Sequence, residues 1–179
     1  ELVLFFIDLD RFKYINDTLG HAIGDELLQV IALRLRHCLK QTDTIARLGG
    51  DEFTVLIESP PPQKVLAEIA ERVAFELSRP CVVCGHELAV TCSIGISRYP
   101  QDARGASELM RTADMAMYRA KADGKGIYRR YAADMGRQVI RQHYLSLELR
   151  KALDQSQFRL DWQPIVELPG NQVRYFEAL

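Results

Sequence analysis

The sequence predicts an α+β fold, in which a central sheet rich in antiparallel pairs is flanked by helices. A continuous apolar run opens the chain at Leu2–Ile7, which is typical of a strand buried on both faces. Two apolar, partly β-branched stretches flank Gly49 and Gly50 and predict a hairpin, because glycine accepts the backbone angles of a tight turn. Segments with the helical spacing of apolar residues separate the strands and predict helices packed on the sheet.

Apolar periodicity and turn residues place the other elements along the chain. Helical spacing is found over Asp10–Thr18, Ala22–Lys40, Lys64–Ser78 and Ala106–Ala122. Strands are expected at Asp43–Leu48, Phe53–Ile57 and Ile127–Tyr131, with one hairpin over Cys81–Ser97. Prolines at positions 60–62 favour the start of the third helix, and glycines at 124 and 126 favour the end of the fourth.

Composition is that of an ordinary globular domain and excludes several classes of function. The chain has 179 residues, of which 47% are hydrophobic and 26% charged, with a formal net charge of −1. No general basic field exists to recruit nucleic acid or anionic lipid. No apolar run approaches the roughly 20 residues of a membrane span. The chain opens inside a strand at Glu1 without a leader, so we expect a cytoplasmic fragment of a longer protein, whose absent parts can include a membrane anchor.

Four cysteines leave two interpretations open. Cys81 and Cys84 have the spacing of a zinc knuckle, with Cys92 nearby. In a regular strand Cys81 and Cys84 face opposite sides, which argues against a metal site. We therefore expect the cysteines, including Cys38, to be reduced and to serve as small buried apolar residues.

Acidic residues end the first strand and occupy the tip of the central hairpin. Asp8 and Asp10 follow the apolar run, and Asp51 and Glu52 follow the glycine pair. Acidic turn residues are commonly just solvated. If the hairpin tip lies beside the strand end, however, Asp8, Asp51 and Glu52 form one set of hard oxygen donors. Such a set suits Mg²⁺, or Mn²⁺ in its place, bound together with substrate phosphates.

Four motifs in order carry a resemblance to a known family. They are Asp8-x-Asp10-x-Phe12-Lys13-x-x-Asn16-Asp17, Gly20-His21-x-x-Gly24-Asp25, Arg47-x-Gly49-Gly50-Asp51-Glu52-Phe53 and Ala113-Asp114-x-Ala116-x-Tyr118-x-Ala120-Lys121-x-x-Gly124-Lys125. Over residues 1–131 the chain resembles the GGDEF domain of bacterial diguanylate cyclases, without its N-terminal start. The resemblance implies a nucleotidyl-cyclase-like fold with a ferredoxin-like βαββαβ core. It also implies that two GTP molecules are joined into cyclic di-GMP, with release of pyrophosphate, by a homodimer in which each copy holds one GTP.

The resemblance also assigns roles to individual residues. It implies that Asp8, Asp51 and the Leu9 carbonyl bind the metal, and that Glu52 binds metal or assists deprotonation of the attacking hydroxyl, so that Asp51 and Glu52 are the catalytic acids. Lys13, Lys121 and Lys125 match phosphate contacts, and Gly49 and Gly50 let the backbone approach the phosphates. Asn16 and Asp25 match the groups that recognise guanine. Phe12 and Phe53 are interpreted as core residues.

The chain departs from the family pattern at three positions. Lys125 stands where the family usually has arginine, which removes a bidentate contact, and Gly126 replaces an asparagine. The inhibitory product site, Arg-x-x-Asp in the family, reads Lys40-Gln41-Thr42-Asp43 here, so we expect weak or absent product inhibition. These changes leave a second hypothesis open, in which the domain only binds GTP and regulates an attached phosphodiesterase. A third, a scaffold without either role, is disfavoured by the intact acids.

The last part of the sequence differs in pattern from residues 1–131. We expect a linking helix over residues 132–156, then two strands at Phe158–Glu167 and Gln172–Leu179. Gln163-Pro164-Ile165-Val166 and Glu177-Ala178-Leu179 resemble the opening of an EAL domain, the family that hydrolyses cyclic di-GMP. Residues 157–179 would hold only its first strands, with Glu177 matching a metal ligand, and are too few for hydrolysis.

Overall fold

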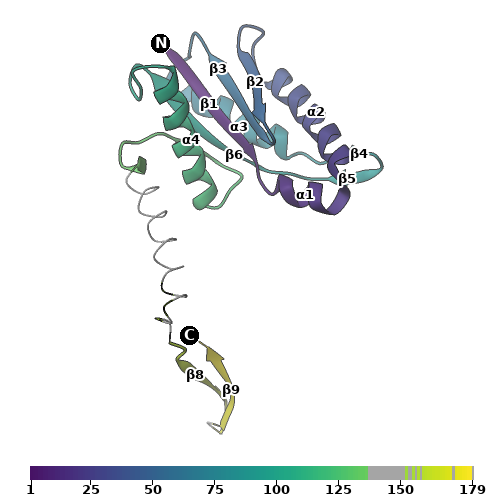
Figure 1. The fold of residues 1–179 in the computed structure, drawn as a ribbon, viewed down its shortest axis with the longest axis vertical. Coiled ribbons are helices and arrows are strands. Elements are labelled where there is room, and N and C mark those ends of the chain that lie inside the picture. The colour runs from purple at the N-terminus through teal and green to yellow at the C-terminus, as the bar shows by residue number, and fades with distance from the viewer. Residues whose placement is uncertain (137–151, 153–154, 156, 158, 171, 179) are drawn as a thin grey trace. The chain divides into compact units, whose positions relative to one another are not determined.

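The computed structural model describes residues 1–136, 152, 155, 157, 159–170 and 172–178. Its internal contacts divide the chain into two units, Glu1–Val139 and Ile140–Leu179. The elements of the first unit are β1 (Leu2–Leu9), α1 (Phe12–Leu19), α2 (His21–Cys38), β2 (Thr44–Gly49), β3 (Glu52–Ile57), α3 (Gln63–Ser78), β4 (Cys81–Val83), β5 (His86–Leu88), β6 (Cys92–Tyr99), α4 (Ala106–Ala122) and β7 (Tyr128–Arg130) (Figure 1).

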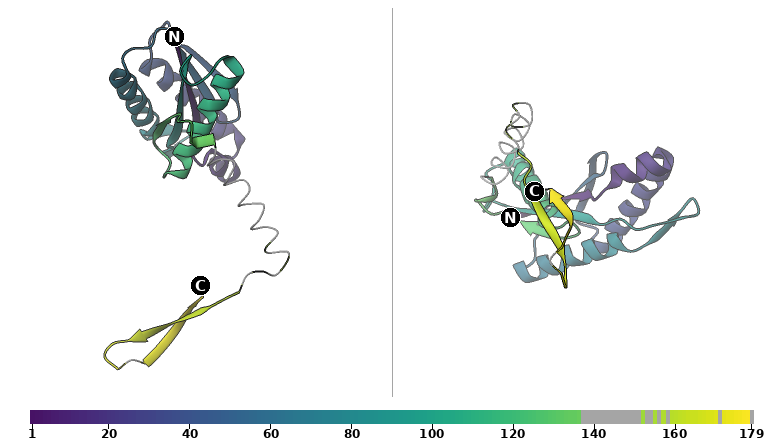
Figure 2. Two further views of the ribbon diagram at one scale, coloured as in Figure 1. Left: turned by 90° about the vertical axis from the view of Figure 1, so that its left-hand side faces the viewer. Right: turned by 90° about the horizontal axis from the view of Figure 1, so that it is seen from below.

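Strand β1 lies at the centre of a five-stranded sheet of order β2-β3-β1-β6-β7. It pairs antiparallel with β3 and β6, and only β7 runs parallel to its neighbour β6. Helices α2 and α3 cover one face of the sheet and α4 covers the other (Figure 2). This mixed architecture with an antiparallel-rich sheet confirms the predicted fold class.

Both faces of β1 are buried, as its uninterrupted apolar sequence predicts. Val3, Phe5, Ile7 and Leu9 pack into the core formed with α2 and α3, whereas Leu4 and Phe6 pack against α4. Because side chains alternate along a strand, Asp8 follows Leu4 and Phe6 onto the α4 face. The core interpretation of Phe12 and Phe53 is confirmed, since they are 5% and 2% exposed.

Two element predictions need correction. Helix α1 begins at Phe12 rather than Asp10, because Arg11 adopts a left-handed conformation with φ of 61°. The expected Cys81–Ser97 hairpin is confirmed only in its first part: β4 and β5 pair as a separate two-stranded sheet, whereas β6 joins the main sheet. The chain leaves the small hairpin after β5, and the Thr91 carbonyl then accepts the backbone N–H of Asp10 at 2.8 Å. Beside β1, eight residues of β6 gain a complete ladder of partners.

Helix α4 packs unusually closely on β6. A Cβ atom added to Gly95 would lie 1.9 Å from the Ala113 carbonyl oxygen and 2.2 Å from the Met117 nitrogen. Only a residue without a side chain allows this approach. Two buried hydroxyls, those of Ser97 and Thr112, hydrogen-bond across the same interface at 2.6 Å. The position of α4 over the sheet is therefore closely constrained.

The second unit contains an antiparallel hairpin of β8 (Trp162–Glu167) and β9 (Gln172–Ala178). The strand expected from residue 158 begins at Trp162. The predicted linking helix over residues 132–156 falls almost entirely outside the described residues. Among the helices that the structure describes, none combines the length and apolar character needed to cross a membrane.

Candidate active site

The structure brings the two acidic turns together at one end of the sheet. Asp8 on β1 is the register partner of Glu52 on β3, and residues opposite each other on antiparallel strands share a face. The backbone N–H of Leu9 donates to the carbonyl of Asp51 at 3.3 Å. Asp8, Asp51 and Glu52 therefore meet as the sequence predicts, although they come from segments more than 40 residues apart in the chain.

The hairpin that carries Asp51 and Glu52 has an irregular, braced tip. Gly50 adopts a positive φ of 53°, and a register shift lies between Arg47 and Gly49. The Arg47 guanidinium donates from Nε to the carbonyl of Gly50 at 2.9 Å. Of the two glycines, only Gly50 uses the left-handed region. The sequence motif includes Arg47, but the hydrogen bond from its guanidinium to the hairpin tip was not predicted.

Lys121 provides the positive charge that faces the acids. Its Nζ lies 2.7 Å from Oδ1 of Asp8, with exposed side-chain fractions of 30% for Lys121 and 10% for Asp8. Burial raises the pKa of Asp8, and the nearby Asp51 and Asp10 add to that rise, while the hydrogen bond and charge of Lys121 lower it. The lysine predicted to contact phosphate thus neutralises a predicted metal ligand in this structure.

A further carboxylate, Asp114, reaches the cluster from α4. Burial, and then the charges of Asp8, Asp114 and Asp51, raise the pKa of Glu52. The pKa of Asp114 is also raised, because burial outweighs the lowering effect of the Lys121 charge. Asp114 precedes Lys121 by seven residues, two turns of helix, which places both on the same side of α4. That spacing could have indicated its place from the sequence.

Asp10 shares the α4 face with Asp8, but its carboxylate is already fully engaged. Oδ1 accepts the Ser93 hydroxyl at 2.8 Å, and Oδ2 accepts the Thr91 hydroxyl at 2.7 Å and the Gly126 backbone N–H at 3.0 Å. With these contacts in place Asp10 is a structural acceptor. Its partners lie more than 80 residues away in sequence and carry no local signal.

The acids fit a hard divalent cation in chemistry, though they do not form a ready-made metal cage. Mutually repelling carboxylates at close range suit a bound Mg²⁺ or Mn²⁺. Within residues 1–136 and the described parts beyond them, no group of three or more His, Cys, Asp or Glu side chains has the geometry of a metal site. The contact between Lys121 and Asp8 shows that a cation is favoured there, and a metal would have to displace it.

Of the two predicted guanine-recognising residues, Asp25 lines a pocket of about 440 Å³. Arg47 and Phe53 line the same pocket. Asn16 is packed against Gly24, where an added Cβ would lie 1.9 Å from its Oδ1. That Oδ1 is buried and has no hydrogen-bond partner among the described residues, so a ligand would reach it only after the side chain turned away from Gly24.

Lys13 and Lys125, the other predicted phosphate contacts, are exposed. Lys125 and Gly126 both have left-handed backbones, with φ of 64° and 63°. They belong to the turn between α4 and β7. Lys13 is in the first turn of α1. Both lysines are accessible to an anionic ligand, as a phosphate contact requires.

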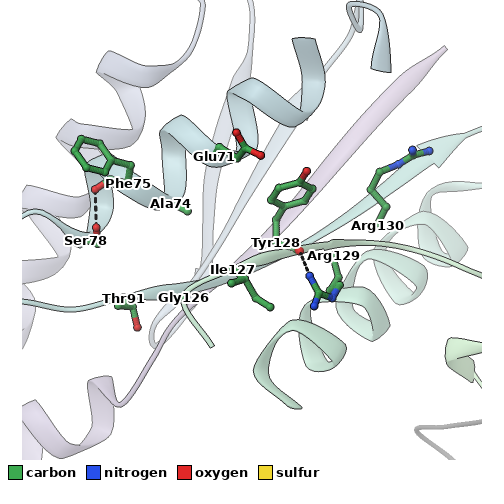
Figure 3. Close-up of a pocket in the computed structure, with 10 residues that line it drawn as sticks. All are labelled: Glu71, Ala74, Phe75, Ser78, Thr91, Gly126, Ile127, Tyr128, Arg129 and Arg130. Atoms are coloured by element: carbon green, nitrogen blue, oxygen red, sulfur yellow. Dashed lines mark hydrogen bonds between the residues drawn. The ribbon is translucent and has the colours of Figure 1, made fainter. Parts of the chain in front are cut away.

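Two other pockets lie away from the acids. One of about 700 Å³ lies between α3 and β7 and is lined by Phe75, Tyr128 and neighbouring residues (Figure 3). None of the predicted site residues lines it. The other, of about 430 Å³, contains Lys40, Asp43 and Arg72, so the altered product-site residues do face a cavity.

The cysteine predictions are borne out in part. Cys38 and Cys92 are buried, Cys81 is half-buried, and all four thiols are free. Cys84 is exposed, contrary to the expectation of a buried residue, because it occupies the tip of the β4–β5 hairpin with φ of 47°. Within the described residues no zinc-type cluster is present.

Comparison with known proteins decides the family. The family model described as "Diguanylate cyclase, GGDEF domain" matches residues 1–126. The chain belongs to the GGDEF family. The GGDEF domain of TpbB (YfiN) from Pseudomonas aeruginosa superposes with a TM-score of 0.74 at 40% identity, covering 77% of this chain and 81% of that one.

Relatives extend the likeness over the whole chain. The "bifunctional diguanylate cyclase/cyclic di-GMP phosphodiesterase" MucR of P. aeruginosa is 42% identical over 179 residues, which is 100% of this chain and 26% of MucR. The "cyclic di-GMP phosphodiesterase" NbdA of the same species is 35% identical, over 99% of this chain and 23% of NbdA. The chain thus spans about a quarter of the length of these curated relatives, and the GGDEF domain described above is one part of such proteins.

Proposed function

We propose that this GGDEF domain is a diguanylate cyclase that joins two GTP molecules into cyclic di-GMP and releases pyrophosphate. A role in cyclic di-GMP signalling is supported by the family and by the names of its relatives. The observation that carries the enzymatic proposal is the pairing of Asp8 with Glu52 in register, beside Asp51 and facing Lys121. A domain that had lost catalysis would not be expected to keep four charged groups converged at one strand end.

The acids at the end of β1 and at the hairpin tip would bind the metal and accept the proton. Asp8, Asp51 and the Leu9 carbonyl would hold a divalent cation, which when bound lowers the pKa of the attacking 3′-hydroxyl and neutralises charge on the phosphates. Glu52 faces the same space, and its raised pKa suits a group that accepts a proton from that hydroxyl.

Nucleotide binding would use the surrounding residues. Lys121, once released from Asp8, would contact the terminal phosphates together with Lys13 and Lys125. Asn16 and Asp25 would accept and donate along the Watson–Crick edge of guanine, where a carboxylate matches the paired N1–H and N2–H₂ donors. Gly49 and Gly50 leave room beside the hairpin backbone, since a Cβ at either position would meet nothing within 4 Å.

One copy supplies only half of the reaction, because each domain would hold one GTP. We therefore infer a catalytic homodimer with the two sites facing each other. At low protein concentration the rate per molecule should rise with concentration, whereas a monomeric enzyme would give a constant rate.

We further infer that the β8–β9 hairpin opens an EAL domain. The MucR match continues to the end of this chain, and MucR is named for both activities. Glu177 lies on β9, opposite Gln163 on β8. A longer protein that contains this segment should hydrolyse cyclic di-GMP, and a variant with Glu177→Gln should not.

A second candidate function is regulation of that hydrolysis by GTP binding. It is favoured by Lys125 and Gly126, which replace the family's arginine and asparagine, and by the name of NbdA as a phosphodiesterase. The test is to incubate the parent protein with Mg²⁺ and GTP and to measure cyclic di-GMP, with Asp8→Asn as the control. Product that depends on Asp8 supports the cyclase; GTP binding without product, together with faster hydrolysis, would select the regulator.

A further inference from the structure

Asp10 is a buried carboxylate that faces hydrogen-bond donors from two distant segments. It is 6% exposed. Thr91 and Ser93 donate their hydroxyls from the entry to β6, and Gly126 donates its backbone N–H from the turn after α4. The backbone N–H of Asp10 in turn donates to the Thr91 carbonyl at 2.8 Å. The end of β1, the start of β6 and the α4–β7 turn therefore meet at this one side chain.

The end of α4 and the turn that follows it carry the two lysines proposed to contact the terminal phosphates. Lys121 lies at the end of α4, and Lys125 directly precedes Gly126. Thr91 and Gly126 lie next to each other (Figure 3), and a Cβ on Gly126 would be 3.5 Å from the Cβ of Thr91. Two consecutive left-handed residues make this turn unusual, and such a backbone persists only when its surroundings hold it.

We propose that Asp10 is a positioning residue that fixes the α4–β7 turn relative to the acid-bearing end of β1, and so aligns Lys121 and Lys125 with the terminal phosphates of the nucleotide. The proposal rests on the proposed function. Two donors converge on Oδ2 of Asp10, so the carboxylate fixes the direction of the turn as well as its distance. The contact uses the backbone of residue 126, so it survives the replacement of the family's asparagine by Gly126.

The alternative is a purely structural role, in which Asp10 only accepts hydrogen bonds from buried donors and stabilises the fold. The two roles differ in which ligand they affect. A loosened turn weakens contacts to the β- and γ-phosphates and leaves contacts to the guanosine unchanged, because Asn16 and Asp25 belong to other elements. General destabilisation would weaken every nucleotide alike.

The experiment compares Asp10→Asn with the parent in the whole chain. Binding of GMP and of a GTP analogue with a methylene bridge between the α- and β-phosphates, which blocks transfer, is measured by calorimetry with Mg²⁺. Exchange of the Gly126 amide hydrogen is followed by NMR. Asp102→Asn is the matched control, because Asp102 accepts the Arg98 backbone N–H at 2.9 Å near the opposite end of β6. Thr91→Val is a second variant that removes one donor with little change in shape.

For Asp10→Asn we expect affinity for the triphosphate analogue to fall about tenfold, since a charge-assisted contact is lost, and affinity for GMP to change less than about twofold. Exchange at Gly126 should accelerate about tenfold. Thr91→Val should change both readouts in the same direction, and Asp102→Asn neither.

Equal loss of both nucleotides, or unchanged exchange at Gly126, would overturn the proposal. If Asp10→Asn fails to fold, Thr91→Val decides by the same criteria. If the parent binds neither nucleotide, the proposed function fails, and Gly126 exchange alone then shows whether Asp10 anchors the turn.

Discussion

Replacing Lys121 by methionine removes the cation that stands against Asp8 at the end of β1. Methionine keeps the approximate length of the side chain and has a similar helix propensity, so the change is mainly one of charge. The acids that remain, Asp8, Glu52 and Asp51, would then repel one another without compensation. We expect the variant to fold and to be less stable than the parent near neutral pH.

The expected loss of stability follows from how deeply the Lys121–Asp8 ion pair is buried. Removing one partner of a fully buried pair costs about 3–5 kcal/mol, and an exposed pair contributes about 0–1 kcal/mol. With side-chain exposures of 30% for Lys121 and 10% for Asp8, the pair lies between these limits. We expect a loss of about 2 kcal/mol near pH 7.5, which lowers the melting temperature by about 7 °C in a domain of this size.

The raised pKa of Asp8 predicts how the stability of the variant changes with pH. The pKa of Asp8 in the folded state lies above its ordinary value of 3.8, so its proton favours the folded state and that stability is lost as pH rises through the folded pKa. Lys121 lowers this pKa; without it the folded pKa rises further and the loss at neutral pH grows. The deficit of the Lys121→Met variant should therefore be large at about pH 7.5 and small at about pH 4.5.

Thermal unfolding of four proteins at both pH values tests this. Adding Asp8→Asn to Lys121→Met should restore most of the lost stability, and Lys125→Met, which changes an exposed lysine of the neighbouring turn, should cost almost nothing. Mg²⁺ without nucleotide should raise the melting temperature of Lys121→Met more than that of the parent. A deficit that is equal at both pH values, or one that Asp8→Asn does not relieve, would refute the reasoning.

Three further predictions concern other parts of the domain. Cyclic di-GMP should inhibit the parent weakly, and Lys40→Arg should strengthen inhibition about tenfold by restoring a bidentate contact; strong inhibition of the parent in steady-state assays would contradict this. Gly95→Ala should destabilise the domain by about 3 kcal/mol in urea unfolding, because the added methyl meets the Ala113 carbonyl at 1.9 Å. In a maleimide time course Cys84 should react first and Cys92 last, because Cys84 is exposed and burial raises the pKa of Cys92 far above that of a free thiol; modification of Cys92 in the folded protein would disprove it.

The sequence predicted the parts of the site that local patterns encode. An apolar run ending in Asp8, and a diglycine followed by Asp51 and Glu52, were enough to expect one acidic cluster. Periodicity could not show which sheet a strand joins, so the start of β6 was expected in the hairpin with β4 rather than beside β1. Nor could it show that Asp10 has partners 81 and 116 residues away, because such contacts depend on the completed fold.

The register between β1 and β3 ties the chemistry of the domain to its hydrophobic interior. Phe53 lies opposite Ile7, and Glu52 lies opposite Asp8. A slip of β3 by one residue would turn Glu52 away from Asp8 and α4, and would drive Phe53 out of the core. Selection for a well-packed interior thus also preserves the alignment of the acids. Substitutions should therefore accumulate in the loops of this domain long before they shift Asp8 relative to Glu52.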